Sequence, residues 1–111
     1  MNELNKDAQE KLQQLQIMEQ SLHATLAQKQ NFQAQQLEVE SAISQLSGKK
    51  TAYRIIGSIM IESDAESMKK ELEEKKEKID IRIKSLDRQE EKVKSKAESL
   101  QKDVLEGMKK Q

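Results

Sequence analysis

The stretch TAYRIIGSIMIES, residues 51–63, lies near the middle of the 111-residue chain and decides the fold. In it, two short runs of β-branched and aliphatic residues flank the pair Gly57-Ser58. Glycine tolerates the positive φ that a type II′ turn requires at its first central position, and a Gly-led pair between two apolar runs is typical of a hairpin. The stretch therefore predicts a two-stranded β-hairpin over residues 51–62.

This hairpin is too small to be stable on its own. Two strands of about four or five residues are marginal in water, and their outer edges leave backbone donors and acceptors unpaired. We expect pairing with the same element of other subunits, which would close a sheet or barrel; a bend packed on its own helices is the alternative. The residues expected to drive this assembly are Tyr53, Ile55, Ile56, Gly57, Ile59, Met60 and Ile61.

The composition favours a coiled coil over a large globular core. Charged residues make up 36% of the chain, and Tyr53 and Phe32 are its only aromatic residues. Abundant Glu, Lys, Gln and Leu at heptad spacing indicate long helices. The 20 basic and 20 acidic residues cancel, so net charge provides no attraction to nucleic acid or an anionic membrane.

The sequence contains no pattern that suggests catalysis. The absence of cysteine excludes a thiol nucleophile and cysteine-based metal sites, and His23 is the single histidine. No glycine-rich phosphate loop or nucleophile–base pair is visible, so we predict a protein that is not an enzyme, with no cofactor and no metal. No apolar run approaches the ~20 residues of a membrane span, and MNELNKDAQE does not resemble a secretory signal. A soluble, cytoplasmic protein is expected.

The first arm is predicted to be a helix over residues 2–47 with an apolar seam interrupted by polar residues. Ser47-Gly48 ends it plausibly, because glycine accepts the left-handed conformation beyond a last turn. Polar residues in such a seam lower stability and set register. The a positions are Ala8, Leu15, Leu22, Lys29, Gln36 and Ile43, and the d positions are Leu4, Lys11, Met18, Thr25, Phe32, Val39 and Leu46.

The second arm is predicted to be a helix over residues 64–110, opened by a capping box in which Ser63 is the N-cap and Glu66 its partner. Many acid-first pairs at i,i+4 spacing describe a solvated surface. The a positions are Lys69, Lys76, Ile83, Glu90, Ala97 and Val104, and the d positions are Ala65, Leu72, Ile79, Leu86, Val93, Leu100 and Gly107.

Arms of nearly equal length on either side of a hairpin predict an antiparallel coiled coil, and we expect a single domain over residues 1–111. Matching apolar layers favours a register that pairs Phe32 with Ile83 and Leu22 with Val93, and it places Thr25 beside Glu90. The expected fold is therefore mainly α: a long antiparallel helical hairpin with a central two-stranded β-hairpin that assembles into a β-barrel with other subunits.

The two ends of the chain carry more apolar side chains than a two-helix seam can hide. Leu12, Ile17, Leu105 and Met108 fall off the seam near the termini. Exposed apolar surface of this kind usually marks an interaction site, although fraying of helix ends is the alternative. The predicted binding residues are Leu4, Leu12, Leu15, Leu100, Val104, Leu105 and Met108.

The order of helix, hairpin around YRIIGSIMI, and returning helix with the run Arg88-Gln89-Glu90-Glu91 resembles the β-type subunits of the prefoldin family over essentially the whole chain. The single hairpin suggests the β type, since the α type carries two. The resemblance implies a hetero-hexamer of two α-type and four β-type subunits, with hairpins in a double β-barrel and coiled coils extending from it.

The same resemblance implies an ATP-independent chaperone. It would capture unfolded polypeptides at the coiled-coil tips and deliver them to a group II chaperonin. Lys109 and Lys110, beside the predicted binding residues, would attract an acidic surface such as a chaperonin rim. The competing hypothesis is a structural coiled-coil scaffold or tether without chaperone activity, in which the hairpin is merely a turn.

Overall fold

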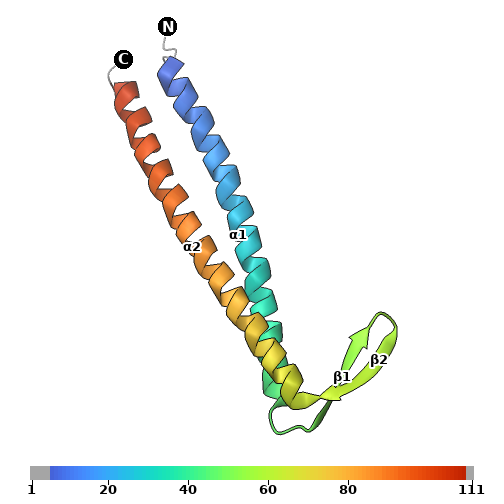
Figure 1. Ribbon diagram of the computed structural model, residues 1–111. Coiled ribbons are helices and arrows are strands. Elements are labelled where there is room, and N and C mark those ends of the chain that lie inside the picture. The colour runs from blue at the N-terminus through green and yellow to red at the C-terminus, as the bar shows by residue number, and fades with distance from the viewer. Residues whose placement is uncertain (1–5, 110–111) are drawn as a thin grey trace. The chain divides into compact units, whose positions relative to one another are not determined.

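The computed structural model describes residues 6–109, in the order helix, hairpin, helix (Figure 1). Helix α1 spans Lys6–Leu46, strand β1 Thr51–Ile56, strand β2 Ile59–Asp64 and helix α2 Ala65–Lys109. This confirms the predicted helical hairpin with a central two-stranded β-hairpin. Residues 2–5 and 110, which the sequence also assigned to helix, lie outside the described part of the chain.

The chain divides into two compact units, and each contains a segment of both helices. The hairpin unit comprises Gln30–Lys84, with both strands; the terminal unit comprises Met1–Lys29 and Ser85–Gln111. Each unit is described separately below.

In the hairpin unit, β1 and β2 pair antiparallel from Ile56 opposite Ile59 to Thr51 opposite Asp64. Gly57-Ser58 connects them, and Gly57 has a φ of +62°. Among residues 6–109 positive φ occurs only at glycine, so Ser58 has a negative value. A type I′ turn needs positive φ at both central residues, whereas type II′ needs it only at the first. The backbone therefore agrees with the predicted type II′ turn.

Helix α1 ends at Leu46, one residue before the predicted end at residue 47. Gly48 has a φ of +77°, and the Lys49 amide donates to the Leu46 carbonyl at 3.1 Å. A glycine in the left-handed conformation just past the last turn is a common way to satisfy the final carbonyl groups. It also lets the chain leave the helix axis and enter β1 three residues later.

Helix α2 begins one residue later than predicted, and the predicted capping box at Ser63 is wrong. Its N-cap is Asp64, whose Oδ2 accepts hydrogen bonds from the Ser67 amide at 2.9 Å and the Ser67 hydroxyl at 3.0 Å. The physical reason is the length of the β-ladder: it runs through Asp64, so α2 begins only at Ala65, and Asp64 rather than Ser63 is the residue directly before the helix. The hairpin accordingly extends to residue 64 rather than 62.

The core of the hairpin unit is a narrow seam between α1 and α2. Val39, Ala65 and Ile79 are buried, as their predicted d positions require. Gln36 donates to Asp80, and Lys76 lies 3.6 Å from Glu40. As numbers rise along α1, the partners in α2 fall, so the two helical segments run antiparallel as predicted.

The terminal unit repeats this arrangement with more polar side chains in the seam. Ala8, Leu86 and Val104 are buried, and so is Thr25. Lys11 lies 4.0 Å from Asp103, and Lys29 lies 2.6 Å from Asp87 and 3.2 Å from Glu90. Each lysine in the seam therefore has an acidic partner on the other helix, which specifies the antiparallel register.

Candidate assembly and polypeptide-binding surfaces

The first candidate surface is the hairpin sheet, whose apolar side chains are exposed. We call it the assembly surface, defined as Tyr53, Ile55, Ile56, Ile59, Met60 and Ile61 with the turn residue Gly57. Ile55 is 70% exposed, Met60 64% and Ile59 62%. Fully burying an aliphatic side chain contributes about 1.5–3 kcal/mol, so this exposure leaves a large driving force for association unused.

The strand register distributes these residues over both faces of the sheet. Residues directly opposite each other share a face, and neighbours along a strand alternate. Ile55 lies opposite Met60, with Tyr53 on the same face, whereas Ile56 lies opposite Ile59, with Ile61 on the other face. Tyr53 and Ile55 therefore share one face of the sheet, and Ile59 and Ile61 share the other. Neither face of the sheet suits water.

The edges of the sheet point to the same need. Within residues 6–109 the sheet has only two strands, so each strand has one unpaired edge. Such an edge presents free N–H and C=O groups that another strand can pair with. Apolar faces and open edges together describe an element that is completed by other chains.

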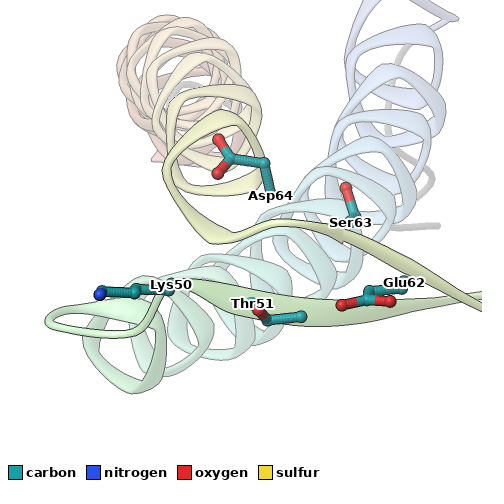
Figure 2. A pocket seen from close by; sticks show the side chains of 5 residues that line it. All are labelled: Lys50, Thr51, Glu62, Ser63 and Asp64. Atoms are coloured by element: carbon teal, nitrogen blue, oxygen red, sulfur yellow. The ribbon is translucent and has the colours of Figure 1, made fainter.

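The base of the hairpin is polar and serves to hold the strands against the helices. Lys50, Thr51, Glu62, Ser63 and Asp64 line a shallow pocket there, and Figure 2 shows Lys50 and Thr51 entering the sheet while Asp64 lies at the first turn of α2. The Ala65 amide donates to the Lys50 carbonyl at 3.1 Å. Asp64 is already engaged as the N-cap, so the pocket is a structural junction.

A side-chain ion pair also links the hairpin to a helix. Arg54 Nη2 of β1 lies 2.5 Å from Glu71 Oε2 of α2. Glu71 is exposed and Arg54 is half-buried, and ion pairs at the protein surface contribute about 0–1 kcal/mol. The contact therefore orients the hairpin more than it stabilises it.

The second candidate surface is an apolar groove in the terminal unit, between α1 and α2. Val104 at its floor is buried, and Leu105 and Met108 at its rim are 54% and 50% exposed. The terminal groove is lined by Leu12, Leu15, Gln16, Glu19, Gln101, Val104, Leu105 and Met108. Its volume is about 510 Å³.

The structure brings together five of the seven predicted binding residues in this groove: Leu12, Leu15, Val104, Leu105 and Met108. Leu100 is half-buried in the seam instead and does not line the groove. Leu4 lies outside the described residues, as does Lys110, while Lys109 is exposed.

Sequence reasoning missed the polar part of the groove, which consists of Gln16, Glu19 and Gln101. These residues occupy heptad positions b and e, which flank one side of the seam. The heptad pattern assigns these residues to the flank of the seam. It does not show which of the two flanks forms a groove, because that depends on the side chains of both helices. The result is an apolar groove with a polar and acidic margin.

Polar seam residues form a charged cluster elsewhere in the terminal unit. Glu90 accepts from Lys29, and Lys94 lies 2.9 Å from Glu90. The hydrogen bond from Lys94, with that from Lys29, lowers the pKa of Glu90 below its ordinary value. The hydrogen bond to Asp87, followed by that to Glu90, raises the pKa of Lys29. Each charge in the cluster has a partner of opposite sign. The cluster therefore favours this register of the coiled coil over others.

Two further observations limit the chemistry of the described chain. Over residues 6–109 no group of three or more His, Asp or Glu side chains is placed to hold a metal ion. Neither α1 nor α2, as far as the structure describes them, contains a stretch apolar enough to cross a bilayer.

These features define a class: a helical-hairpin subunit that offers a central β-hairpin to other chains. Residues 8–111 match the family described as prefoldin subunit. The chain is 38% identical to prefoldin subunit beta of Archaeoglobus fulgidus over 106 residues, covering 92% of this chain and 91% of that one. It is 31% identical to prefoldin subunit beta of Methanothrix thermoacetophila, covering 96% and 91%.

The fold comparison agrees with the sequence comparison. The structure is similar to that of the prefoldin beta subunit from Thermococcus strain KS-1, with a TM-score of 0.89, 26% identity and 97% of each chain covered. The chain therefore belongs to the prefoldin family of chaperone subunits, and its relatives are of the β type. The predicted family and subunit type are confirmed.

Proposed function

We propose that this chain is a subunit of an ATP-independent holdase chaperone that binds unfolded polypeptides in its terminal groove. The observation that carries the proposal is the coexistence, in a prefoldin subunit, of an exposed assembly surface and a separate apolar groove. One surface needs permanent partners and the other is free to bind a transient ligand. We place this activity in the cytoplasm and propose no enzymatic activity.

The assembly surface is proposed to complete a β-barrel with other subunits, in a hetero-hexamer of two α-type and four β-type chains. Both apolar faces and both open edges of the hairpin would be satisfied in a closed sheet, because closure removes edges altogether. The positions Tyr53, Ile55, Ile56, Gly57, Ile59, Met60 and Ile61 would carry these contacts.

Capture in the terminal groove would be weak for one chain and strong for an assembly. Leu105 and Met108 are only half exposed, so a mobile client would bury a fraction of each side chain. Met is flexible and polarizable, which suits it to contacts with varied sequences. Several grooves acting on one client raise the effective concentration and hence the overall affinity. We also include the other two predicted binding residues, Leu4 and Leu100, in the proposed site.

Release to a group II chaperonin is proposed to use Lys109 and Lys110. These lysines directly follow Met108, a rim residue of the groove, in the sequence. They would meet an acidic surface of the chaperonin. Such a contact weakens as salt rises, because exposed charges are screened over about 8–10 Å at physiological ionic strength. Apolar capture in the groove would persist at the same salt concentration.

The proposal is tested by aggregation suppression without nucleotide. The assembled full-length protein should keep an unfolded client soluble in the absence of ATP, whereas a structural tether would not. An assembly of chains shortened to residues 18–96, which lack the groove, should keep its mass and lose this protection. A shortened assembly that protects as well as the full-length protein would place client binding elsewhere, in the space between the arms.

A further inference from the structure

In the terminal unit, one stretch of α2, between residues 85 and 102, carries basic side chains on the flank opposite the terminal groove. Two ion pairs between the helices identify the flanks: Lys29 pairs with Asp87 on one side, and Lys11 pairs with Asp103 on the other. Heptad positions b and e line the first flank, which includes Asp87, Glu91 and the terminal groove. Positions c and g line the second flank. The second flank is not basic along its whole length, because Asp7, Glu10, Asp103 and Glu106 also occupy these positions.

At positions f, c and g, on and beside the second flank, α2 carries a basic row. The basic row consists of Arg88, Lys92 and Lys96, which follow one another at i,i+4 spacing and are all exposed. At positions c, f and g between residues 85 and 102 there is no acidic side chain. Among the described residues, none of the three forms an ion pair within 4.0 Å.

This row is unfavourable for the isolated helix. Like charges at i,i+4 destabilise a helix by about 0.2–0.5 kcal/mol per pair, and most of α2 instead places an acid before a base at that spacing. A shallow groove of about 510 Å³ lies against Arg88, Gln89 and Lys92. The basic side chains of the row therefore repel one another, and the shallow groove beside them could hold a ligand of opposite charge.

The neighbouring surface of α1 provides no counter-charge. On the same flank, between residues 14 and 28, positions c and g hold only uncharged residues: Gln14, Ile17, Ser21, Ala24 and Gln28. Ile17 is 65% exposed. The flank is thus basic on α2 and uncharged on α1, with one apolar side chain and several amide or hydroxyl groups beside the row.

We propose that the basic row, with Ile17 beside it, is a docking surface for an acidic segment of a polypeptide that carries an apolar residue among its Asp and Glu side chains. Carboxylates would neutralise Arg88, Lys92 and Lys96, and the apolar residue would cover Ile17. A polypeptide fits better than a single-stranded nucleic acid, because bases stack mainly on aromatic side chains and the terminal unit has no Phe, Tyr or Trp. This surface is distinct from the terminal groove and does not depend on client capture there.

The test uses the assembled full-length protein and a fluorescent peptide of about fifteen residues rich in Asp and Glu around one Leu. The triple variant Arg88→Gln, Lys92→Gln, Lys96→Gln should bind this peptide about tenfold more weakly, as expected for three exposed charge pairs. The control variant Lys49→Gln, Lys70→Gln, Lys75→Gln removes the same charge from exposed positions of the hairpin unit and should bind as the unchanged protein does. Binding should weaken when salt rises from about 0.05 M to about 0.5 M.

Equal losses in the two triple variants would overturn the proposal, because attraction would then be diffuse. Binding of a lysine-rich peptide with the same affinity would also overturn it. Preferential binding of a single-stranded oligouridine, lost in the basic-row variant, would show a nucleic-acid surface instead. Each measurement is independent of aggregation suppression, so its failure leaves the proposed function standing.

Discussion

The assembly surface and the terminal groove are both exposed and apolar, yet they are built in different ways. On the hairpin, apolar residues occupy both faces of a two-stranded sheet with open edges, and Ile55 is 70% exposed. In the groove, buried Val104 forms the floor, Leu12 is only 38% exposed, and glutamine and glutamate form the margin.

This difference indicates two kinds of partner. A sheet whose two apolar faces and unpaired backbone groups are exposed to water is unfavourable in an isolated chain. Other strands must complete it, so its partner should be permanent. A groove whose floor is already packed in a coiled-coil seam is stable while empty, and its partner can come and go. Each prediction below tests one side of this contrast.

The largest effect is expected from charge on the assembly surface. The double variant Ile59→Lys, Ile61→Lys places two ammonium groups on one face of the sheet, at a cost of several kcal/mol if they are buried unpaired. The oligomer should dissociate to a smaller species that remains helical by circular dichroism. Light scattering measures the mass. Ile81→Lys, at an exposed site outside the hairpin, should leave it unchanged, and an intact oligomer in the double variant would contradict the barrel.

The next effect separates the seam from the groove rim. Leu86→Ala removes a side chain that is only 3% exposed and should lower the free energy of unfolding by about 2–5 kcal/mol. Leu105→Ala, at a half-exposed rim position, should change it by less than about 1 kcal/mol. Urea denaturation of the two variants measures the difference. Similar losses would mean that the rim is part of the core rather than a free binding surface.

A smaller effect tests how the assembly surface joins α2. Asp64→Ala removes the carboxylate that accepts from Ser67 and should cost about 1 kcal/mol, the usual cost of an N-cap. Ser63→Ala is the matched control and should be near neutral, because Ser63 lies one residue before the N-cap. Thermal denaturation compares the melting temperatures of the two variants and shows which residue is the N-cap. The reverse order would restore the capping box at Ser63.

The smallest effect concerns pH and the charged cluster of the terminal unit. The pKa of Glu90 is lowered by hydrogen bonds from Lys94 and Lys29, so the stability it contributes is present above its ordinary pKa and is lost as pH falls through the lowered value. Glu90→Gln should flatten part of the acid dependence of the melting temperature. Glu91→Gln, on the exposed surface, should not. Identical acid profiles for the two variants would contradict this assignment.

Much of the fold was predictable because heptad spacing and glycine conformation are local properties. Every predicted a and d position that the structure describes is buried or half-buried. Matching the apolar layers also gave a register that agrees with the ion pairs: with Thr25 placed beside Glu90, Lys29 one turn later comes close to Asp87, and the two side chains lie 2.6 Å apart. Gly57 and Gly48 marked the two places where the backbone needs positive φ.

The sequence did not decide where α2 begins, which residues line the groove, or how chains assemble, because these features depend on contacts between elements. Ser63 and Asp64 are both good N-cap residues, and the choice between them follows from how far the β-ladder runs. The groove is formed by side chains of both helices, so the sequence of one helix does not show that Gln16, Glu19 and Gln101 line it. The assembly itself depends on surfaces of other chains, so the barrel and the client site stay predictions.

The most direct test of the account is the loss of client protection when the groove alone is altered. The double variant Leu105→Ser, Met108→Ser removes the apolar rim, and its matched control, Leu37→Ser, Ile81→Ser, removes two apolar side chains that are more exposed but lie in the hairpin unit. Light scattering of an aggregating client should show that the assembled groove variant loses most of its protection at equal mass and helicity, while the control protects like the unchanged protein. Full protection by the groove variant, or equal loss in both, would contradict the assignment of client binding to the terminal groove.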